Sequence, residues 1–226
     1  MKILVGIPTC RNYEPFWKSI DGFFHILKRQ VDVEVFIVEN KTIAEARNEI
    51  ADKFLLSDSD YLLFLDDDHA GHTLQMFNAL LDPILNNDSV VCGMHCYTKI
   101  FPYFSNISVY SNVDEKSLGI KEGTGKYMPV DLDGGYGYVD LLGFGMTIVS
   151  REAFNLIDKP YFVGENNVHE DNYFCEQLIK AGHRPIGCFD HVLEHQGIGR
   201  YNARILRERG FSELRQKHPD MKVLVA

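Results

Sequence analysis

The sequence predicts an α/β domain whose mainly parallel central sheet carries helices on both faces. Along the first hundred residues, short apolar runs of strand length alternate with apolar residues at helical spacing. The chain has 226 residues, which is enough for one such domain and too few for two of ordinary size. With 45% hydrophobic and 24% charged residues, the composition is that of a globular protein and excludes the disordered and collagen-like classes.

Two strand-helix units open the chain. The apolar run at residues 3–7, closed by Pro8, predicts a buried strand. The helix that follows has apolar residues at Phe16, Ile20, Phe23, Phe24 and Leu27. Residues 31–38 predict the next strand, and Thr42 with Glu45 forms the pattern of a capping box, which predicts the start of a helix. The inward residues of that helix are Ala46, Ile50 and Phe54.

The same alternation continues with a third strand of fully apolar type at residues 61–65. The next helix is predicted by apolar residues at Leu74, Phe77, Leu80, Leu81, Ile84 and Leu85. A strand at residues 90–92 follows. Because strands joined by helices run parallel, we expect a mainly parallel sheet that is covered on both faces.

The second half of the chain is less regular, because 8 of the 18 glycines in the whole sequence lie between Gly119 and Gly145. We expect turns, close backbone contacts and mobile loops in this region, which either bind a ligand or form a surface excursion of the sheet. Further on, the pattern predicts a strand at residues 139–149, a helix at residues 170–181 and a last short strand at residues 184–189.

The charge balance argues against a polyanionic partner. The chain carries 23 Lys+Arg against 32 Asp+Glu, a formal net charge of -9, so we expect neither nucleic acid nor an anionic membrane as partner. No apolar run is long enough to span a membrane or to act as a signal peptide, and five cysteines suggest free thiols. We therefore expect a cytoplasmic protein. Residues 200–226 carry an excess of basic residues and predict a basic helical tail, either solvated, or in contact with the acidic body of another subunit, or in weak contact with an anionic acceptor or membrane.

Asp66, Asp67 and Asp68 directly follow the third strand, at the carboxyl edge where open α/β sheets bind ligands. Two carboxylates about 4 Å apart repel by roughly 4 kcal/mol at an effective dielectric constant near 20, so the cluster favours a bound cation. Its hard oxygen ligands suit Mn²⁺ or Mg²⁺. A calcium loop starting at Asp66 would need Glu where Phe77 stands, and no P-loop pattern occurs.

Several short motifs occur in this sequence in the same order, and at similar spacing, as in one known protein family. They are the opening segment at residues 5–12, Ala46-Arg47-Asn48, the strand ending in Asp66-Asp67-Asp68, Gly143-Phe144-Gly145-Met146 with residues 151–154, Glu170-Asp171 with residues 172–175, residues 180–184 and His195-Gln196-Gly197. From residue 3 to about residue 199, the sequence resembles the glycosyltransferases of the GT-A fold, also called the nucleotide-diphospho-sugar transferase fold, and especially their broad family 2.

The resemblance implies one catalytic domain over residues 1–226, with a nucleotide-sugar-binding half at 1–100, an acceptor-binding half at 101–199 and the tail at 200–226. It implies that Mn²⁺ or Mg²⁺ is held by Asp68 with Asp66 and His195. The residues implied in binding the nucleotide donor are Pro8, Thr9, Arg11, Glu39, Arg47, Asp66, Asp67 and Arg200. Asp171 would be the catalytic base and Glu170 would orient the acceptor, and we expect the start of their helix to favour both ionised forms.

The implied activity is transfer of one sugar from a nucleoside-diphosphate sugar, expected to be a UDP-sugar, to a hydroxyl of a carbohydrate or glycoconjugate, with inversion. The Gln-x-x-Arg-Trp signature of processive synthases is absent, since the one tryptophan is Trp17. His169 stands where the family commonly has glycine. A phosphotransferase or phosphatase that uses the Asp cluster, and an inactive carbohydrate- or nucleotide-binding protein, remain alternatives. A homo-oligomer also remains open.

Overall fold

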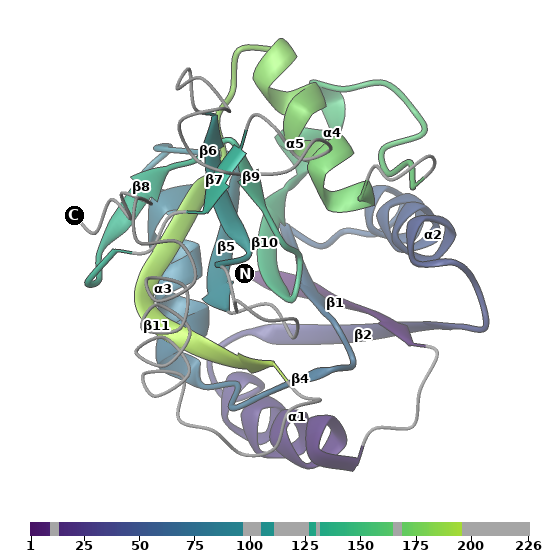
Figure 1. Cartoon of the computed structure of the whole chain (residues 1–226). Helices are drawn as coiled ribbons and strands as arrows, with labels where there is room; N and C mark the ends of the chain where they lie inside the picture. The colour runs from purple at the N-terminus through teal and green to yellow at the C-terminus, as the bar shows by residue number, and fades with distance from the viewer. Residues whose placement is uncertain (10–13, 97–104, 111–126, 130–131, 165–168, 196–226) are drawn as a thin grey trace.

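The computed structural model describes residues 1–9, 14–96, 105–110, 127–129, 132–164 and 169–195 (Figure 1). Their central sheet has eight strands. Its main path runs in the order β2 (Asp32–Glu39), β1 (Lys2–Thr9), β3 (Tyr61–Leu65), β10 (Met146–Ser150), β5 (Val91–Cys96), β11 (Ile186–His195) and β4 (His69–Ala70). The eighth strand, β8 (Tyr136–Tyr138), pairs with β11. A smaller sheet holds β7 (Tyr127–Pro129), β6 (Ile107–Tyr110) and β9 (Leu141–Leu142).

The central sheet is mainly parallel, as the sequence predicted. Strands β2, β1 and β3 are parallel neighbours, and β5 is parallel to β11. Strand β10 lies between β3 and β5 and is antiparallel to both, so β5 and β11 point the same way as the first three strands. The carboxyl ends of five strands therefore share one edge of the sheet, and the start of β10 lies at that edge too.

Helices cover both faces of the sheet. On one face the core includes buried side chains of α2 (Ile43–Leu56), α4 (Arg151–Asn155) and α5 (Glu170–Lys180), and on the other those of α1 (Glu14–Leu27) and α3 (Leu74–Leu85). The predicted capping box opens α2, because the Thr42 hydroxyl accepts from the Glu45 N–H and the Glu45 carboxylate accepts from the Thr42 N–H. Each helix thus buries an apolar stripe against the sheet.

The predicted single strand at residues 139–149 is wrong. Its first part is β9, which pairs with β6 in the small sheet, and its last part is β10, which pairs with β3 and β5. Two glycines allow the chain to change sheets here. A Cβ on Gly143 would lie 3.0 Å from the Asn106 amide nitrogen, and a Cβ on Gly145 would lie 2.7 Å from the ring of His69.

The last strand is longer than the predicted span of residues 184–189. Strand β11 continues to His195, and its register with β5 shifts between Cys188 and Val192. The apolar sequence pattern stops near this irregularity, so the predicted strand ended there. The observed strand continues because it goes on pairing with β5 and then with β4. Helix α5 ends as predicted before Gly182, which has a φ of 88°.

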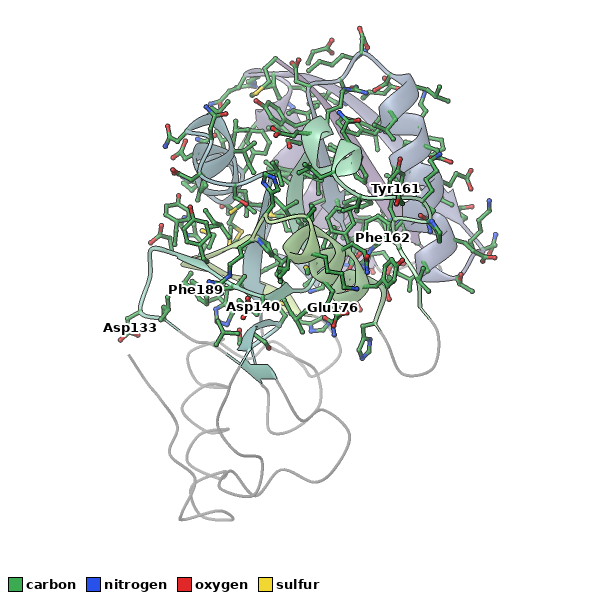
Figure 2. The ribbon with its side chains drawn as sticks, turned by 90° about the horizontal axis from the view of Figure 1, so that it is seen from above. Asp133, Asp140, Tyr161, Phe162, Glu176 and Phe189 are labelled. Atoms are coloured by element: carbon green, nitrogen blue, oxygen red, sulfur yellow. The ribbon has the colours of Figure 1, made fainter. Side chains whose placement is uncertain are left out.

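A short segment before α5 is tied to α2 by Asn48. Its side-chain amide donates to the Phe162 carbonyl at 2.7 Å, and its oxygen accepts from the N–H groups of Tyr161 and Phe162. Figure 2 labels Tyr161 and Phe162 in this segment. Asn48 also donates to the Ala44 carbonyl within α2. Asn48, the third residue of the Ala-Arg-Asn motif, therefore has a structural role, because it holds Tyr161 and Phe162 against α2. Among the described helices, none is long and apolar enough to cross a membrane.

Candidate functional site

The polar residues singled out by sequence meet at the carboxyl edge of the sheet. Thr9 ends β1, Asp66 follows β3, and His195 ends β11. Gly145 lies directly before the reversed strand β10, and its carbonyl accepts from the Asp66 N–H at 3.0 Å. The parallel arrangement of β1, β3 and β11 therefore brings distant parts of the chain to one place. Figure 1 shows the end of β11 beside β4.

A cavity of about 260 Å³ opens at this edge. It is lined by Pro8, Thr9, Lys41, Ile43, Ala46, Arg47, Asp66, Asp67, Asp68, Glu170 and Asp171. Five of these residues carry carboxyl groups and two carry positive charges. The cavity is therefore acidic, and the structure brings most of the predicted site residues together around it.

Arg47 lies beneath the cavity with only 2% of its surface exposed. Its Nη2 donates to both oxygens of Asp66 at 2.9 Å, and its Nη1 donates to Glu170. The Arg47 guanidinium carbon also lies 5.2 Å from the centre of the Phe144 ring. Burial lowers the pKa of Arg47, but the charges of Asp66 and Glu170 outweigh it and leave the pKa raised. The guanidinium stays charged and holds two carboxylates from different parts of the chain.

The three consecutive aspartates have different partners. Asp66 is held by Arg47, and burial raises its pKa although Arg47 opposes the shift. Asp67 is buried and accepts from the Thr9 hydroxyl at 2.6 Å. This bond uses the hydroxyl of Thr9, a residue that we expected to bind the nucleotide donor. Asp68 faces two imidazoles instead, with one oxygen 2.8 Å from His69 Nδ1 and the other 3.5 Å from His195 Nε2.

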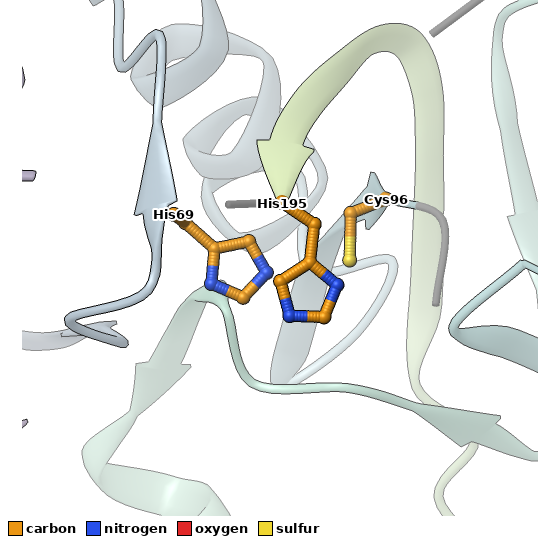
Figure 3. A group of neighbouring side chains, drawn as sticks. All are labelled: His69, Cys96 and His195. Carbon is orange, nitrogen blue, oxygen red and sulfur yellow. The ribbon is translucent and has the colours of Figure 1, made fainter. Parts of the chain in front are cut away.

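His69 and His195 come together because β4 pairs with the end of β11, with His69 opposite His195. Their rings stack with centroids 4.3 Å apart and an angle of 4° between the planes. Figure 3 shows the two rings beside Cys96, which ends β5. Within the part of the chain that the structure describes, two groups of donor atoms lie close enough together to hold an ion. One comes from Asp66, Asp68 and His69, and the other from His69, Cys96 and His195.

Glu170 and Asp171 open α5 and line the cavity. We expected the helix start to favour both ionised forms, but for Asp171 this is wrong, because burial raises its pKa to about 6. Arg47 opposes that shift without cancelling it. We expected Glu170 to orient an acceptor, whereas its carboxylate accepts from Arg47 in the structure. Asp171 and Glu170 therefore differ in environment although they are adjacent in sequence.

The remaining predicted site residues either do not line the cavity or lie outside the described residues. Glu39 ends β2 opposite Thr9 but is exposed and does not line the cavity. Arg11 and Arg200 lie outside the described residues, as does the tail at 200–226. Neither His69 nor Lys41 was predicted as a site residue. Their positions in the sequence could have indicated them, because His69 directly follows Asp68 and Lys41 lies just after β2.

No protein-family model and no curated protein matches the sequence. Solved structures do match. A crystal structure of A197 from STIV aligns over 89% of this chain and 97% of its own, with 20% identity and a TM-score of 0.55. GalNAc-T7 with UDP, GalNAc and Mn²⁺ aligns over 87% of this chain and 44% of its own, with 12% identity and a TM-score of 0.57.

A third structure is that of glucosyl-3-phosphoglycerate synthase from Mycobacterium tuberculosis with Mn²⁺, UDP and phosphoglyceric acid. It aligns over 98% of this chain and 79% of its own, with 10% identity and a TM-score of 0.54. At these identities the likeness shows the fold. The chain has the GT-A fold that the sequence predicted.

Proposed function

We propose that the chain is a metal-dependent glycosyltransferase that moves one sugar from a nucleoside-diphosphate sugar, a UDP-sugar in particular, to an acceptor hydroxyl. One observation carries the proposal. In a GT-A fold, an acidic cavity lies at the carboxyl edge of the sheet, with Asp68 between two imidazoles beside it. Two of the similar structures hold UDP and Mn²⁺.

The residues at the cavity fit a divalent cation. Five carboxyl groups line it, and one of its two positive side chains, Arg47, already holds Asp66 and Glu170. A diphosphate alone would be repelled by such a lining, so its binding requires a cation between the phosphates and the carboxylates. We assign Asp68 and Asp66 as oxygen ligands. An imidazole beside Asp68 completes the set, and the sequence proposed His195 for this place.

A cation bound there would stabilise the negative charge that the departing diphosphate acquires. Arg47 fixes the orientation of Asp66 through its two hydrogen bonds and so prepares that ligand. Lys41 lies on the cavity wall, where it pairs with Glu49, and would contact the nucleotide diphosphate as a second positive group. Pro8 and Thr9 would lie beside the base, with Glu39 near the same edge. Arg11 and Arg200 remain proposed donor contacts.

Asp171 is the proposed base. With a pKa of about 6 it is ionised near neutral pH and yet basic enough to accept a proton from a sugar hydroxyl. Removal of that proton as the hydroxyl attacks the anomeric carbon would give transfer with inversion. Glu170 would keep Arg47 in place between the metal ligands and α5.

Calorimetric titration with UDP, with and without Mn²⁺, tests the proposal. We expect binding that needs Mn²⁺ and is lost in Asp68→Asn. Asp58→Asn is the matched control, because Asp58 is an exposed aspartate that pairs with Lys2 and does not line the cavity. Binding of UDP without metal, or equal binding by Asp68→Asn, would contradict the assigned donor site. Binding without transfer from any UDP-sugar would instead favour an inactive nucleotide-binding protein.

A further inference from the structure

We propose that His69 is the imidazole ligand of the divalent cation, and that His195 stacks on it rather than sharing the ion. This inference rests on the proposed function, because it concerns the same cation. It identifies a ligand that the sequence motifs did not indicate. The argument depends on the direction of the ring nitrogens of His69, the burial of its side chain and its packing against His195.

The His69 side chain is buried without a hydrogen-bond partner for either ring nitrogen among the described residues. Only 4% of the residue is exposed. Its Nδ1 lies 2.8 Å from Asp68 Oδ1, but the two groups are not aligned for a hydrogen bond. A buried polar atom without such a partner carries a desolvation penalty of about 1–3 kcal/mol. A metal ion beside Nδ1 would remove that penalty.

The contact between His69 and Asp68 has the dimensions of two ligands on one ion. Two ligand atoms about 2.1 Å from an octahedral ion, at right angles, lie about 3.0 Å apart. They point at the ion and not at each other, so no linear hydrogen bond forms between them. The 2.8 Å contact of Nδ1 with Oδ1 agrees with this arrangement. Asp66 completes the group, since one donor atom from each residue lies within 4.8 Å of the others.

The stack with His195 argues against a second imidazole on the same ion. An imidazole nitrogen offers its lone pair in the plane of the ring. The planes of His69 and His195 are 4° from parallel, with centroids 4.3 Å apart, so their lone pairs lie in planes that do not meet nearby. The same geometry excludes the group of His69, Cys96 and His195 as one ion's ligand set in this arrangement (Figure 3).

The fold holds the His69 ring in this orientation from two sides. Strand β4 pairs His69 with His195, which places one ring over the other. On another side is Gly145, where a Cβ would lie 2.7 Å from the ring atoms Cε1 and Nε2. The absence of a side chain at Gly145 therefore leaves room for the imidazole, and the ring has little freedom to turn away from Asp68.

Electron paramagnetic resonance of bound Mn²⁺ tests this assignment. The parent chain with Mn²⁺ and UDP is expected to show hyperfine coupling to a directly bound nitrogen. His69→Gln is expected to lose that coupling and to bind Mn²⁺ at least 10-fold more weakly. His195→Gln is expected to keep the coupling. His72→Gln serves as the matched control, because His72 is also buried but contacts Ser19 of α1 instead of Asp68.

Each outcome decides a different point. Nitrogen coupling that persists in His69→Gln, or that is lost in His195→Gln, would overturn the assignment of His69 while leaving the proposed function in place. If the parent does not bind Mn²⁺ at all, both fail. Should His69→Gln not fold, the His195→Gln spectrum still decides, because the assignment requires its coupling to remain.

Discussion

Arg47 donates two hydrogen bonds of 2.9 Å from one nitrogen to the two oxygens of Asp66, and it does so from a buried position on α2. The same guanidinium reaches Glu170 at the start of α5. The interaction therefore joins the end of β3, helix α2 and helix α5. Arg47 therefore helps to set the position of the proposed ligand Asp66 relative to Glu170, which directly precedes the proposed base.

Replacement of Arg47 by methionine is expected to destabilise the fold. It leaves Asp66 and Glu170 beside each other without a counter-charge, and breaking a buried ion pair in this way costs about 3–5 kcal/mol. We expect a loss of roughly 3 kcal/mol in the free energy of unfolding, measured by urea denaturation at pH 7. Adding Asp66→Asn and Glu170→Gln to Arg47→Met should restore part of the loss. A loss below about 1 kcal/mol in the single variant would show that the pairs contribute little.

Replacement of Thr9 by valine tests the bond between β1 and the acidic cluster. Valine has the shape of threonine without the hydroxyl that donates to buried Asp67. We expect Thr9→Val to lower the free energy of unfolding by about 1–3 kcal/mol, because Asp67 loses a hydrogen bond while it stays buried. Thr9→Ser keeps the hydroxyl and is the matched control. Equal stability of the valine and serine variants would contradict a stabilising role for this bond.

Local patterns explain why part of this structure was predictable. The capping box at Thr42 and the apolar strand before Asp66 depend on neighbouring residues, and the structure confirms both elements. Their place in a parallel sheet also put the aspartates at the binding edge. The fold class followed from the same alternation of strands and helices.

Features that depend on long-range pairing were not predictable from local patterns. The reversed strand β10 is separated from β9 only by residues 143–145, and the sequence there reads as one apolar run. The stack of His69 on His195 arises from pairing of β4 with β11. The raised pKa of Asp171 reflects burial, which sequence position does not reveal. The sequence thus indicated the candidate residues, while tertiary contacts set their environments.

The raised pKa of Asp171 predicts a pH-dependent stability. The ordinary pKa of 3.8 rises to about 6 in the folded chain, so the folded state binds the proton more tightly than the unfolded state between these values. The resulting stabilisation is complete below about pH 4 and is lost as the pH rises through about 6. Its upper limit is about 3 kcal/mol. Urea denaturation from pH 4 to pH 8 should show this decline in the parent and a weaker one in Asp171→Asn. If the free energy of unfolding depends on pH in the same way in the parent and in Asp171→Asn, the raised pKa of Asp171 is contradicted.

The same group predicts how sugar transfer depends on pH. As the proposed base, Asp171 would accept a proton only when it is ionised, so kcat with an active donor and acceptor pair should rise with pH and level off above about 6. Asp171→Asn should lower kcat by about 10²–10⁴-fold and leave the affinity for UDP with Mn²⁺ unchanged, because it removes the base without removing a proposed metal ligand. Stopped-time assays of product and calorimetry of UDP binding measure the two effects separately.

Asp140→Asn is the control, since this aspartate pairs with Arg184 and does not line the cavity. A variant that retains full kcat would remove Asp171 from the mechanism, whereas parallel loss of UDP affinity would place it in donor binding instead.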